Sequence, residues 1–304
     1  MKNILVIGTG TIGEPLIGLL ADFRKELKIG NVFFHKRTPL KDEIAKVNSM
    51  TARGANLVVD EDKVEEFLEL GHTPDMTYDD ALKAADVIID CTPAGNEAKN
   101  RHYLPLIKNK KYEKKIFIAQ GSEKGFGIPF AHGINDEIFT ENIPQFIQIV
   151  SCNTHNICSL IDTIAPDINH LAYGDFTCIR RANDISQAGS FIASPEVGAH
   201  HESVFGTHHA KDAYDLFRTL HCICARIYSP ARLRLILNIC MQFVLICTLS
   251  HILVILMLLI FLRKINLQPL RRKRYLIGCF PSDAIMDIME EYLITPCCLC
   301  LLCI

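Results

Sequence analysis

The chain has 304 residues and a formal net charge of −2, and 49% of its residues are hydrophobic. This length allows a large core and favours two domains, while the small net charge gives no strong field for nucleic acid or a membrane surface. The opening residues, MKNILVIGTG, lack the longer apolar run and the small-residue cleavage site of a secretory signal. We therefore expect a cytoplasmic protein that does not bind nucleic acid.

The turn after the first apolar run carries the first chemical signal. Residues 2–7 predict a strand and residues 14–23 predict a helix, and between them stands the pattern G-x-G-x-x-G. In this motif Gly8 permits the tight turn, Gly10 lets a pyrophosphate approach the backbone, and Gly13 lets the helix pack on the strand. We expect the motif to bind a dinucleotide rather than to serve as a plain structural turn.

A second predicted strand, residues 31–35, ends in two basic residues, Lys36 and Arg37. An enzyme strict for NAD usually has an acidic residue at this point to hold the ribose 2′-hydroxyl. Lysine and arginine suit a 2′-phosphate instead, so we expect NADP as the cofactor, or tolerance of both NADP and NAD. A solvated basic turn is an equally good interpretation of these two residues.

Further strands alternate with helices along the first 150 residues. The sequence predicts helices at residues 60–71 and 77–85, and strands in DVIIDCTPAG, KKIFIAQGSEKG and FIQIV. This alternation predicts an α/β fold with a doubly wound parallel sheet, whose ligands bind at the carboxyl ends of the strands. Thr92, Gly121 and Cys152 each lie at such an end.

Cys152 is the candidate nucleophile. Its thiolate could attack an aldehyde to give a thiohemiacetal, which loses a hydride to nicotinamide and becomes a thioester. Backbone N–H groups at a helix start would hold the oxyanion of that reaction. From position alone, a buried and inert cysteine is almost as good an interpretation. His155 brings a titratable ring near this thiol, or else points to solvent.

Six segments of residues 1–217 together resemble the archaeal-type (type II) glyceraldehyde-3-phosphate dehydrogenases. In that family's order and at similar spacing they are GTGTIG, DVIIDCTPAGNEAKN, QGSEKG, VSCNTH, RRANDISQAGSF and THHAKDA. The resemblance implies NAD(P)-dependent, phosphorylating oxidation of glyceraldehyde 3-phosphate to 1,3-bisphosphoglycerate. It also implies a homotetramer, although that assembly forms through a catalytic domain whose later part this chain does not show.

The resemblance assigns roles to particular residues. Cys152 becomes the acylated nucleophile, with Ser151 and Asn153 beside it at the substrate. The residues that it places in contact with the dinucleotide are Thr11, Ile12, Gly121 and Arg180.

Four histidines gather in GAHHESVFGTHHAKDA, namely His200, His201, His208 and His209. Two adjacent pairs with this separation follow no common metal-ligand spacing, so we predict no metal site. By the resemblance, His208 and His209 match a histidine pair that contacts the substrate phosphate.

The sequence changes character near Phe217. Nine of the 13 cysteines but only one of the 17 glycines lie in residues 218–304, and residues 235–262 carry no charged side chain. We therefore expect an NAD(P)-binding domain at residues 1–150, a partial α+β catalytic domain at residues 151–217, and an anomalous apolar tail at residues 218–304.

A slipped reading frame explains this tail best. The catalytic domain of the family continues as an antiparallel sheet and supplies a histidine as general base, and the tail has the pattern of neither. A genuine membrane segment, which its apolar run is long enough to form, and a divergent buried core remain as alternatives. Two other functions also remain: a related semialdehyde dehydrogenase, against which the Ser-Cys-Asn-Thr string argues, and a non-catalytic, membrane-tethered dinucleotide-binding protein.

Overall fold

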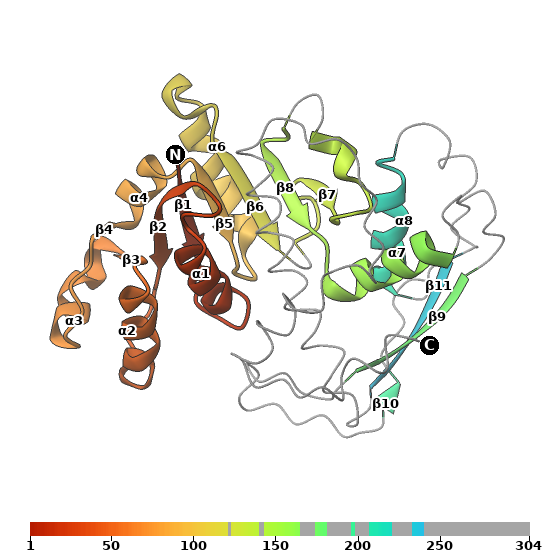
Figure 1. Ribbon diagram of the computed structural model, residues 1–304, viewed down its shortest axis with the longest axis horizontal. Helices are drawn as coiled ribbons and strands as arrows, with labels where there is room; N and C mark the ends of the chain where they lie inside the picture. The colour runs from red at the N-terminus through yellow and green to blue at the C-terminus, as the bar shows by residue number, and fades with distance from the viewer. Residues whose placement is uncertain are drawn as a thin grey trace. The chain divides into compact units, whose positions relative to one another are not determined.

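The fold is given by a computed structural model, shown in Figure 1. It describes residues 1–120, 123–139, 143–164, 174–180, 196–197, 207–220 and 233–239. These residues all belong to one compact unit, Met1–Leu267, whereas a second unit, Gln268–Ile304, lies outside the described residues. The division at residues 150 and 217 stays a prediction.

Eight parallel strands form the main sheet, in the order β4-β3-β2-β1-β5-β6-β8-β7. The strands are β1 (Lys2–Ile7), β2 (Ile29–His35), β3 (Asn56–Val59), β4 (Met76–Thr77), β5 (Val87–Asp90), β6 (Ile116–Gln120), β7 (Ile128–Phe130) and β8 (Phe146–Ile149). The helices between them are α1 (Gly13–Asp22), α2 (Ile44–Ala52), α3 (Val64–Glu69), α4 (Tyr78–Ala84), α5 (Gly95–Ala98) and α6 (Leu104–Ile107), and a π-helical turn, η3 (Lys99–Tyr103), joins the last two. Short 3-10 turns are η1 (Lys41–Glu43), η2 (Glu61–Lys63), η4 (Lys110–Tyr112) and η5 (Asp136–Phe139).

Alternate residues of β1 face two different cores. Ile4 and Val6 pack with residues of α1 and α2, whereas Leu5 and Ile7 pack with residues of α4 and with Tyr103. All four strand side chains are buried, which is the pattern of a parallel strand covered on both faces. The Rossmann-type, doubly wound sheet predicted from the sequence is therefore confirmed.

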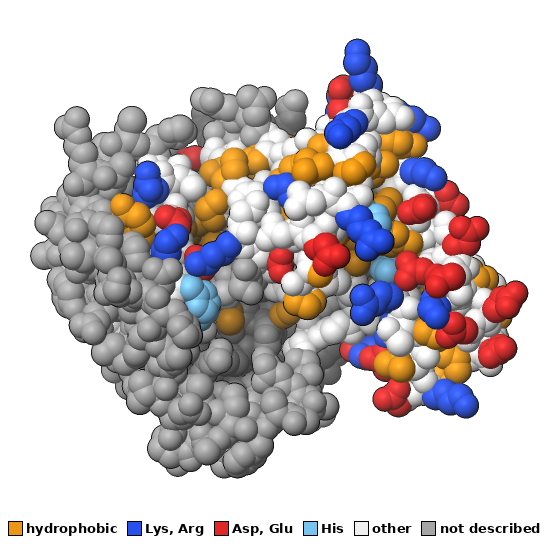
Figure 2. Space-filling model, turned by 180° about the vertical axis from the view of Figure 1, so that it is seen from behind, with side chains coloured by type: hydrophobic (Ala, Val, Ile, Leu, Met, Phe, Trp, Pro, Cys, Tyr) orange, Lys and Arg blue, Asp and Glu red, His pale blue; other side chains and the backbone are white. Residues whose placement is uncertain are grey.

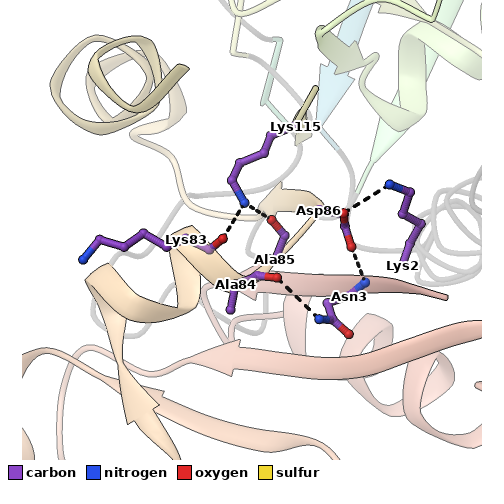
Figure 3. Close-up of polar contacts among 7 residues, drawn as sticks. All are labelled: Lys2, Asn3, Lys83, Ala84, Ala85, Asp86 and Lys115. Carbon is purple, nitrogen blue, oxygen red and sulfur yellow. Dashed lines mark hydrogen bonds and ion pairs between the residues drawn. The ribbon is translucent and has the colours of Figure 1, made fainter. Parts of the chain in front are cut away.

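Asp86 joins the amino ends of two central strands (Figure 3). Its carboxylate accepts a hydrogen bond from the backbone N–H of Asn3 at 2.9 Å, and it forms an ion pair with Lys2 at 3.1 Å. The Asn3 side chain in turn donates to the carbonyl oxygen of Ala84 at 3.4 Å. These contacts fix the start of β5 against the start of β1.

Lys115 caps the last turn of α4 at the same edge of the sheet (Figure 3). Its ammonium donates to the carbonyl oxygen of Lys83 at 2.8 Å and to that of Ala85. Burial lowers the pKa of Lys115. A lysine in this place satisfies carbonyl groups that a helix end leaves without a partner.

Two longer helices follow β8 and pack side by side, α7 (Cys152–Ile164) and α8 (His208–Phe217) (Figure 1). Their contact is an apolar cluster that includes Ile157 and Cys158 of α7 and Ala213 and Leu216 of α8. Because all four side chains are buried, the two helices are held in one packing.

A second sheet contains part of the anomalous tail. It has the order β10-β11-β9, formed by β9 (Gly174–Arg180), β10 (Glu196–Val197) and β11 (Leu233–Ile239). β11 is antiparallel to β10 and parallel to β9. Seven residues of the region expected to be an anomalous apolar tail thus form a strand, since a short apolar run suits a strand as well as a buried helix.

The surface of the described part carries both signs of charge. Figure 2 shows lysine and arginine side chains interspersed with aspartate and glutamate side chains, in keeping with the net charge of −2. None of the helices within the described ranges combines the length and the apolar character that crossing a membrane requires.

Candidate active site

The glycine turn lies where the strand order reverses. From β1 the chain runs outward through β2, β3 and β4, and then returns to β5 on the other side of β1. Gly8 follows β1 with a φ of +92°, and a Cβ built on it would lie 3.1 Å from the Thr92 side chain that follows β5. The two turns therefore meet at the switch point, where doubly wound sheets bind ligands.

The other two glycines of the motif differ in what surrounds them. A Cβ on Gly13 would lie 1.9 Å from the carbonyl oxygen of Gly8, so only glycine lets α1 begin this close to the turn. A Cβ on Gly10 would meet no atom of the described residues within 4 Å, and Gly10 is exposed. Exposed Thr11 and half-buried Ile12 complete the turn, and Ile12 caps α1 without a side-chain hydrogen bond. This open, N–H-bearing helix start fits a dinucleotide pyrophosphate.

Asp90 organises the turn opposite the glycines. One carboxylate oxygen accepts hydrogen bonds from the backbone N–H of Thr92 at 2.9 Å and from its hydroxyl at 2.6 Å. The other accepts from the Tyr103 hydroxyl at 2.6 Å. Burial and the nearby Asp90 raise the pKa of Tyr103, which keeps its hydroxyl a donor. Sequence reasoning missed Asp90, although an acid that ends an apolar strand was a visible signal.

The basic residues after β2 have different surroundings. Lys36 is buried and forms an ion pair with Glu43, whereas Arg37 is exposed. Glu43 also pairs with Lys46 at 2.7 Å; burial raises the pKa of Glu43, but the two lysines outweigh this and lower it. Lys46 reaches back to the carbonyl oxygen of Thr9 in the glycine turn at 3.4 Å. The assignment of Lys36 and Arg37 to a 2′-phosphate stays a prediction, and Lys36 already has a carboxylate partner.

Cys152 is the first residue of α7, immediately beyond the carboxyl end of β8. Ser151 precedes it and accepts a hydrogen bond from the backbone N–H of Thr154 at 3.2 Å, which caps the start of the helix. The Ser151 and Thr154 hydroxyls lie 2.9 Å apart. Cys152 therefore lies at a helix start on the same edge of the sheet as the glycine turn.

His209 connects α8 to the residues on both sides of Cys152. Its Nδ1 lies 3.0 Å from the Ser151 hydroxyl, and its Nε2 lies 3.3 Å from the side-chain nitrogen of Asn153. His209 is buried, whereas the adjacent His208 is exposed, with ring centroids 3.9 Å apart. The structure thus brings together the four residues that the resemblance placed at the substrate beside Cys152, namely Ser151, Asn153, His208 and His209.

His155 points into the protein, which excludes the solvent-facing alternative for this residue. Its side chain is buried, and its Nε2 donates to the carbonyl oxygen of His132 at 3.2 Å. Burial lowers the pKa of His155 to about 4. The ring is therefore neutral near pH 7.

Two other cysteines in the described ranges have environments that disfavour a thiolate. Burial raises the pKa of the Cys91 thiol, which lies beside Asp90, and burial likewise raises the pKa of Cys158. Cys158 lies inside the α7–α8 contact and is fully buried. These environments leave Cys152 as the better candidate for a nucleophile.

Some predicted contacts fall outside the described residues. Gly121 is one, and for Arg180 the structure describes the strand that contains it, β9, but not its side chain. His200 and His201 also lie outside the described ranges. These assignments stay predictions.

The switch point, its glycine turn and the thiol at the start of α7 define an α/β protein with the Rossmann-type fold of dinucleotide-binding proteins and a cysteine at the carboxyl edge of its sheet. Known proteins with similar sequences are archaeal glyceraldehyde-3-phosphate dehydrogenases. The enzyme of Picrophilus torridus is 29% identical over 241 residues, which cover 77% of this chain and 63% of that protein. The enzyme of Methanopyrus kandleri is 30% identical over 192 residues, which cover 61% and 51%. That of Saccharolobus solfataricus is 26% identical over 242 residues, which cover 77% and 64%.

These similarities confirm the resemblance seen in the motifs: most of the chain is similar in sequence to part of the archaeal glyceraldehyde-3-phosphate dehydrogenases. The chain spans less than two thirds of the length of each of the three relatives. No family model matches it.

Proposed function

We propose that the chain is an oxidoreductase that converts glyceraldehyde 3-phosphate and phosphate into 1,3-bisphosphoglycerate with NADP or NAD, through a thioester on Cys152. One observation carries the proposal: Cys152 begins α7 at the edge of the sheet that also bears the glycine turn. The similarity to archaeal glyceraldehyde-3-phosphate dehydrogenases supports the choice of substrate. The proposal includes the glycolytic or gluconeogenic role and the cytoplasmic location.

In this reaction the Cys152 sulfur adds as thiolate to the aldehyde carbon, and the carbonyl oxygen takes up the negative charge. The N–H groups at the start of α7 hold that oxyanion. A bound, oxidised nicotinamide would supply the acceptor for the hydride that leaves the same carbon. The oxyanion re-forms a carbonyl as the hydride leaves, which gives a thioester on Cys152, and a phosphate oxygen then displaces the Cys152 thiolate from it.

The remaining residues bind and orient. Gly8, Gly10 and Gly13, with Thr11 and Ile12, would hold the pyrophosphate at the switch point. Ser151 and Asn153 would lie beside the reacting carbon, and His208 and His209 would lie toward the substrate phosphate. We expect slow turnover, because the family's general-base histidine would come from the part of the chain after residue 217.

Trapping of the acyl enzyme tests this proposal without the need for turnover. The full chain is incubated with glyceraldehyde 3-phosphate and NADP⁺ or NAD⁺ but no phosphate, and the Cys152 peptide is analysed by mass spectrometry. We expect an acyl adduct in the native chain, none in Cys152→Ser, and the native amount in Cys158→Ser. No adduct in the native chain, or an equal adduct in Cys152→Ser, would refute the thioester mechanism. Stronger acylation by aspartate or glutamate semialdehyde would favour the related dehydrogenase instead.

We further propose that the tail after residue 217 comes from a shifted reading frame. Support comes from its excess of cysteine and near absence of glycine, although β11 is formed from residues of this region. Sequencing of codons 210–304 and translation in three frames is the test. A continuation in another frame that is rich in glycine and carries a Met-His pair is expected. If no other frame gives such a continuation, a genuine apolar tail is favoured instead.

A further inference from the structure

His209 has a position that differs from that of a simple ligand-binding histidine. Both ring nitrogens face protein groups, and these groups belong to the two residues that flank Cys152 in the chain. His209 lies 58 residues from Ser151 in sequence, on a different helix. One side chain of α8 therefore holds the start of α7 from both sides of the nucleophile.

The hydrogen bonds define which nitrogen carries the proton. The side-chain nitrogen of Asn153 can only donate, so Nε2 of His209 must accept. Nδ1 then carries the hydrogen and donates it to the Ser151 oxygen. That oxygen also accepts the Thr154 N–H, and the hydroxyl hydrogen of Ser151 is left to point at the Thr154 oxygen. With this assignment each of the four contacts joins one donor to one acceptor.

Packing keeps the ring in place. His209 is only 6% exposed, and α8 is fixed on α7 by the buried contacts of Ile157 and Cys158 with Ala213 and Leu216. A ring held between two helices cannot change its contacts without disturbing that core.

We propose that His209 is a positioning residue: in its Nδ1–H form it fixes Ser151 and Asn153, and so sets the orientation of Cys152 at the start of α7. The inference rests on the proposed function only in taking Cys152 as the nucleophile. It changes the role that the resemblance suggested for His209, and leaves contact with a substrate phosphate to the exposed His208.

The first experiment measures how fast iodoacetamide alkylates Cys152 in the full chain, with quantification by peptide mass spectrometry. We expect His209→Ala to slow alkylation about fivefold, because a loosened first turn stabilises a thiolate less well. His209→Asn keeps a donor for Ser151 and His209→Gln keeps an acceptor for Asn153, so each restores part of the rate. Lys211→Ala, on the same helix and paired with Asp215, is the control and leaves the rate unchanged.

Cys158 serves as an internal measure of folding, because it is buried beneath the same helix pair. Slower alkylation of Cys152 while Cys158 stays protected supports the proposal. An unchanged Cys152 rate in His209→Ala, with Cys158 protected, would overturn it. If Cys158 becomes reactive in the alanine variant, the Asn and Gln variants decide. The role is supported if both variants alkylate Cys152 more slowly than the native chain but faster than His209→Ala does. It is refuted if both alkylate Cys152 as fast as Lys211→Ala does.

The second experiment reads the tautomer in the native chain. The histidines are labelled with ¹⁵N and their ring-nitrogen NMR signals are recorded. The signals that disappear in His209→Asn belong to His209, and we expect them to show a protonated Nδ1 and an unprotonated Nε2. The opposite tautomer, or rapid exchange between the two, would overturn the inference. Neither experiment needs substrate. A chain with the expected tautomer and rates but without an acyl adduct would therefore retain the positioning role and lose the proposed reaction.

Discussion

Polar residues gather both where the parallel strands begin (the amino edge of the main sheet) and where they end (the carboxyl edge), but they have different roles at the two edges. At the amino edge, Lys115 bonds to carbonyl oxygens at the end of α4, and Asp86 bonds to Lys2 and to a backbone N–H (Figure 3). At the carboxyl edge, a Cβ on Gly10 would meet no atom of the part of the chain that the structure describes, and α1 begins without a side-chain cap. Charged side chains alone therefore do not reveal a binding site. Backbone left open to a ligand is the more informative feature.

The direction of the chain explains this difference. In a parallel sheet each connecting helix begins near the carboxyl edge and ends near the amino edge. The carboxyl edge thus presents N–H groups, which suit phosphates and oxyanions, and the amino edge presents carbonyl groups, which suit lysine. Four pairs of substitutions test the contrast.

The largest effect is expected at Gly13, where a methyl group would meet the Gly8 carbonyl oxygen at 1.9 Å. Gly13→Ala should abolish dinucleotide binding and lower the free energy of unfolding by about 3 kcal/mol, because backbone cannot yield as a side chain does. Gly10→Ala is the matched control: its methyl group has room, so stability should stay within about 0.5 kcal/mol while the dinucleotide binds at least about tenfold more weakly. Urea unfolding and equilibrium dialysis measure the two quantities. Unchanged dinucleotide affinity in Gly10→Ala would contradict the assignment of the glycine turn to the pyrophosphate.

His155 should make the carboxyl edge sensitive to acid. Its pKa is about 4 in the fold and 6.5 as the reference value, so between these pH values the unfolded chain binds a proton that the folded chain does not. Stability is therefore complete above pH 6.5 and falls by roughly 3 kcal/mol as the pH drops to 4. His155→Gln should flatten this part of the profile, and exposed His208→Gln should not. Urea titrations at several pH values give the unfolding free energy of each chain. If that free energy falls equally between pH 6.5 and pH 4 in the native and His155→Gln chains, the burial effect is wrong.

Asp90 and Asp86 lie at opposite ends of β5 and offer a paired test. Asp90→Asn should cost about 2 kcal/mol of unfolding free energy, since its new amide donors face the donors of Thr92 and Tyr103. It should also weaken dinucleotide binding, because the turn that packs on Gly8 shifts. Asp86→Asn should lower stability by less than about 1 kcal/mol and leave binding unchanged. The contrast between the edges fails if both variants alter the dissociation constant equally.

Lys115→Met should have the smallest effect. Removing the ammonium leaves carbonyl oxygens at the end of α4 without their donor, which should lower the free energy of unfolding by about 1 kcal/mol. Dinucleotide binding should be unchanged, and Lys111→Met, at an exposed neighbouring position, should alter neither property. A change in binding for Lys115→Met would show that the amino edge is coupled to the ligand.

Local patterns were enough to predict the framework. The runs of residues 2–7 and 31–35 lie in β1 and β2 as predicted. The glycine spacing predicted a turn, and the structure leaves no room for a larger side chain at Gly8 or Gly13. Contacts across long stretches of sequence could not be predicted in this way. Residues 128–130 form a strand beyond β8, and their proline-containing run gave no strand signal.

The candidate site divides along the same line. Cys152 could be recognised because it stands just after an apolar run, with only Ser151 between them. The link between Ser151 and His209 depends on how α7 packs against α8, which no local pattern specifies. The ion pair of Lys36 with Glu43 was missed for a similar reason: the lysine could be read as a ligand contact from sequence, but its burial could not.

The position of β1 has a consequence for synthesis on the ribosome. β1 precedes its partners in the chain, yet it lies in the middle of the sheet between β2 and β5. About 80 residues separate its end at Ile7 from the start of β5 at Val87, which at typical rates of translation takes roughly 4 to 16 seconds. During that interval one side of an apolar strand has no partner of its own and can pair with another nascent chain. The strand that carries the phosphate turn is thus also the segment for which a chaperone that binds extended apolar chains would matter most.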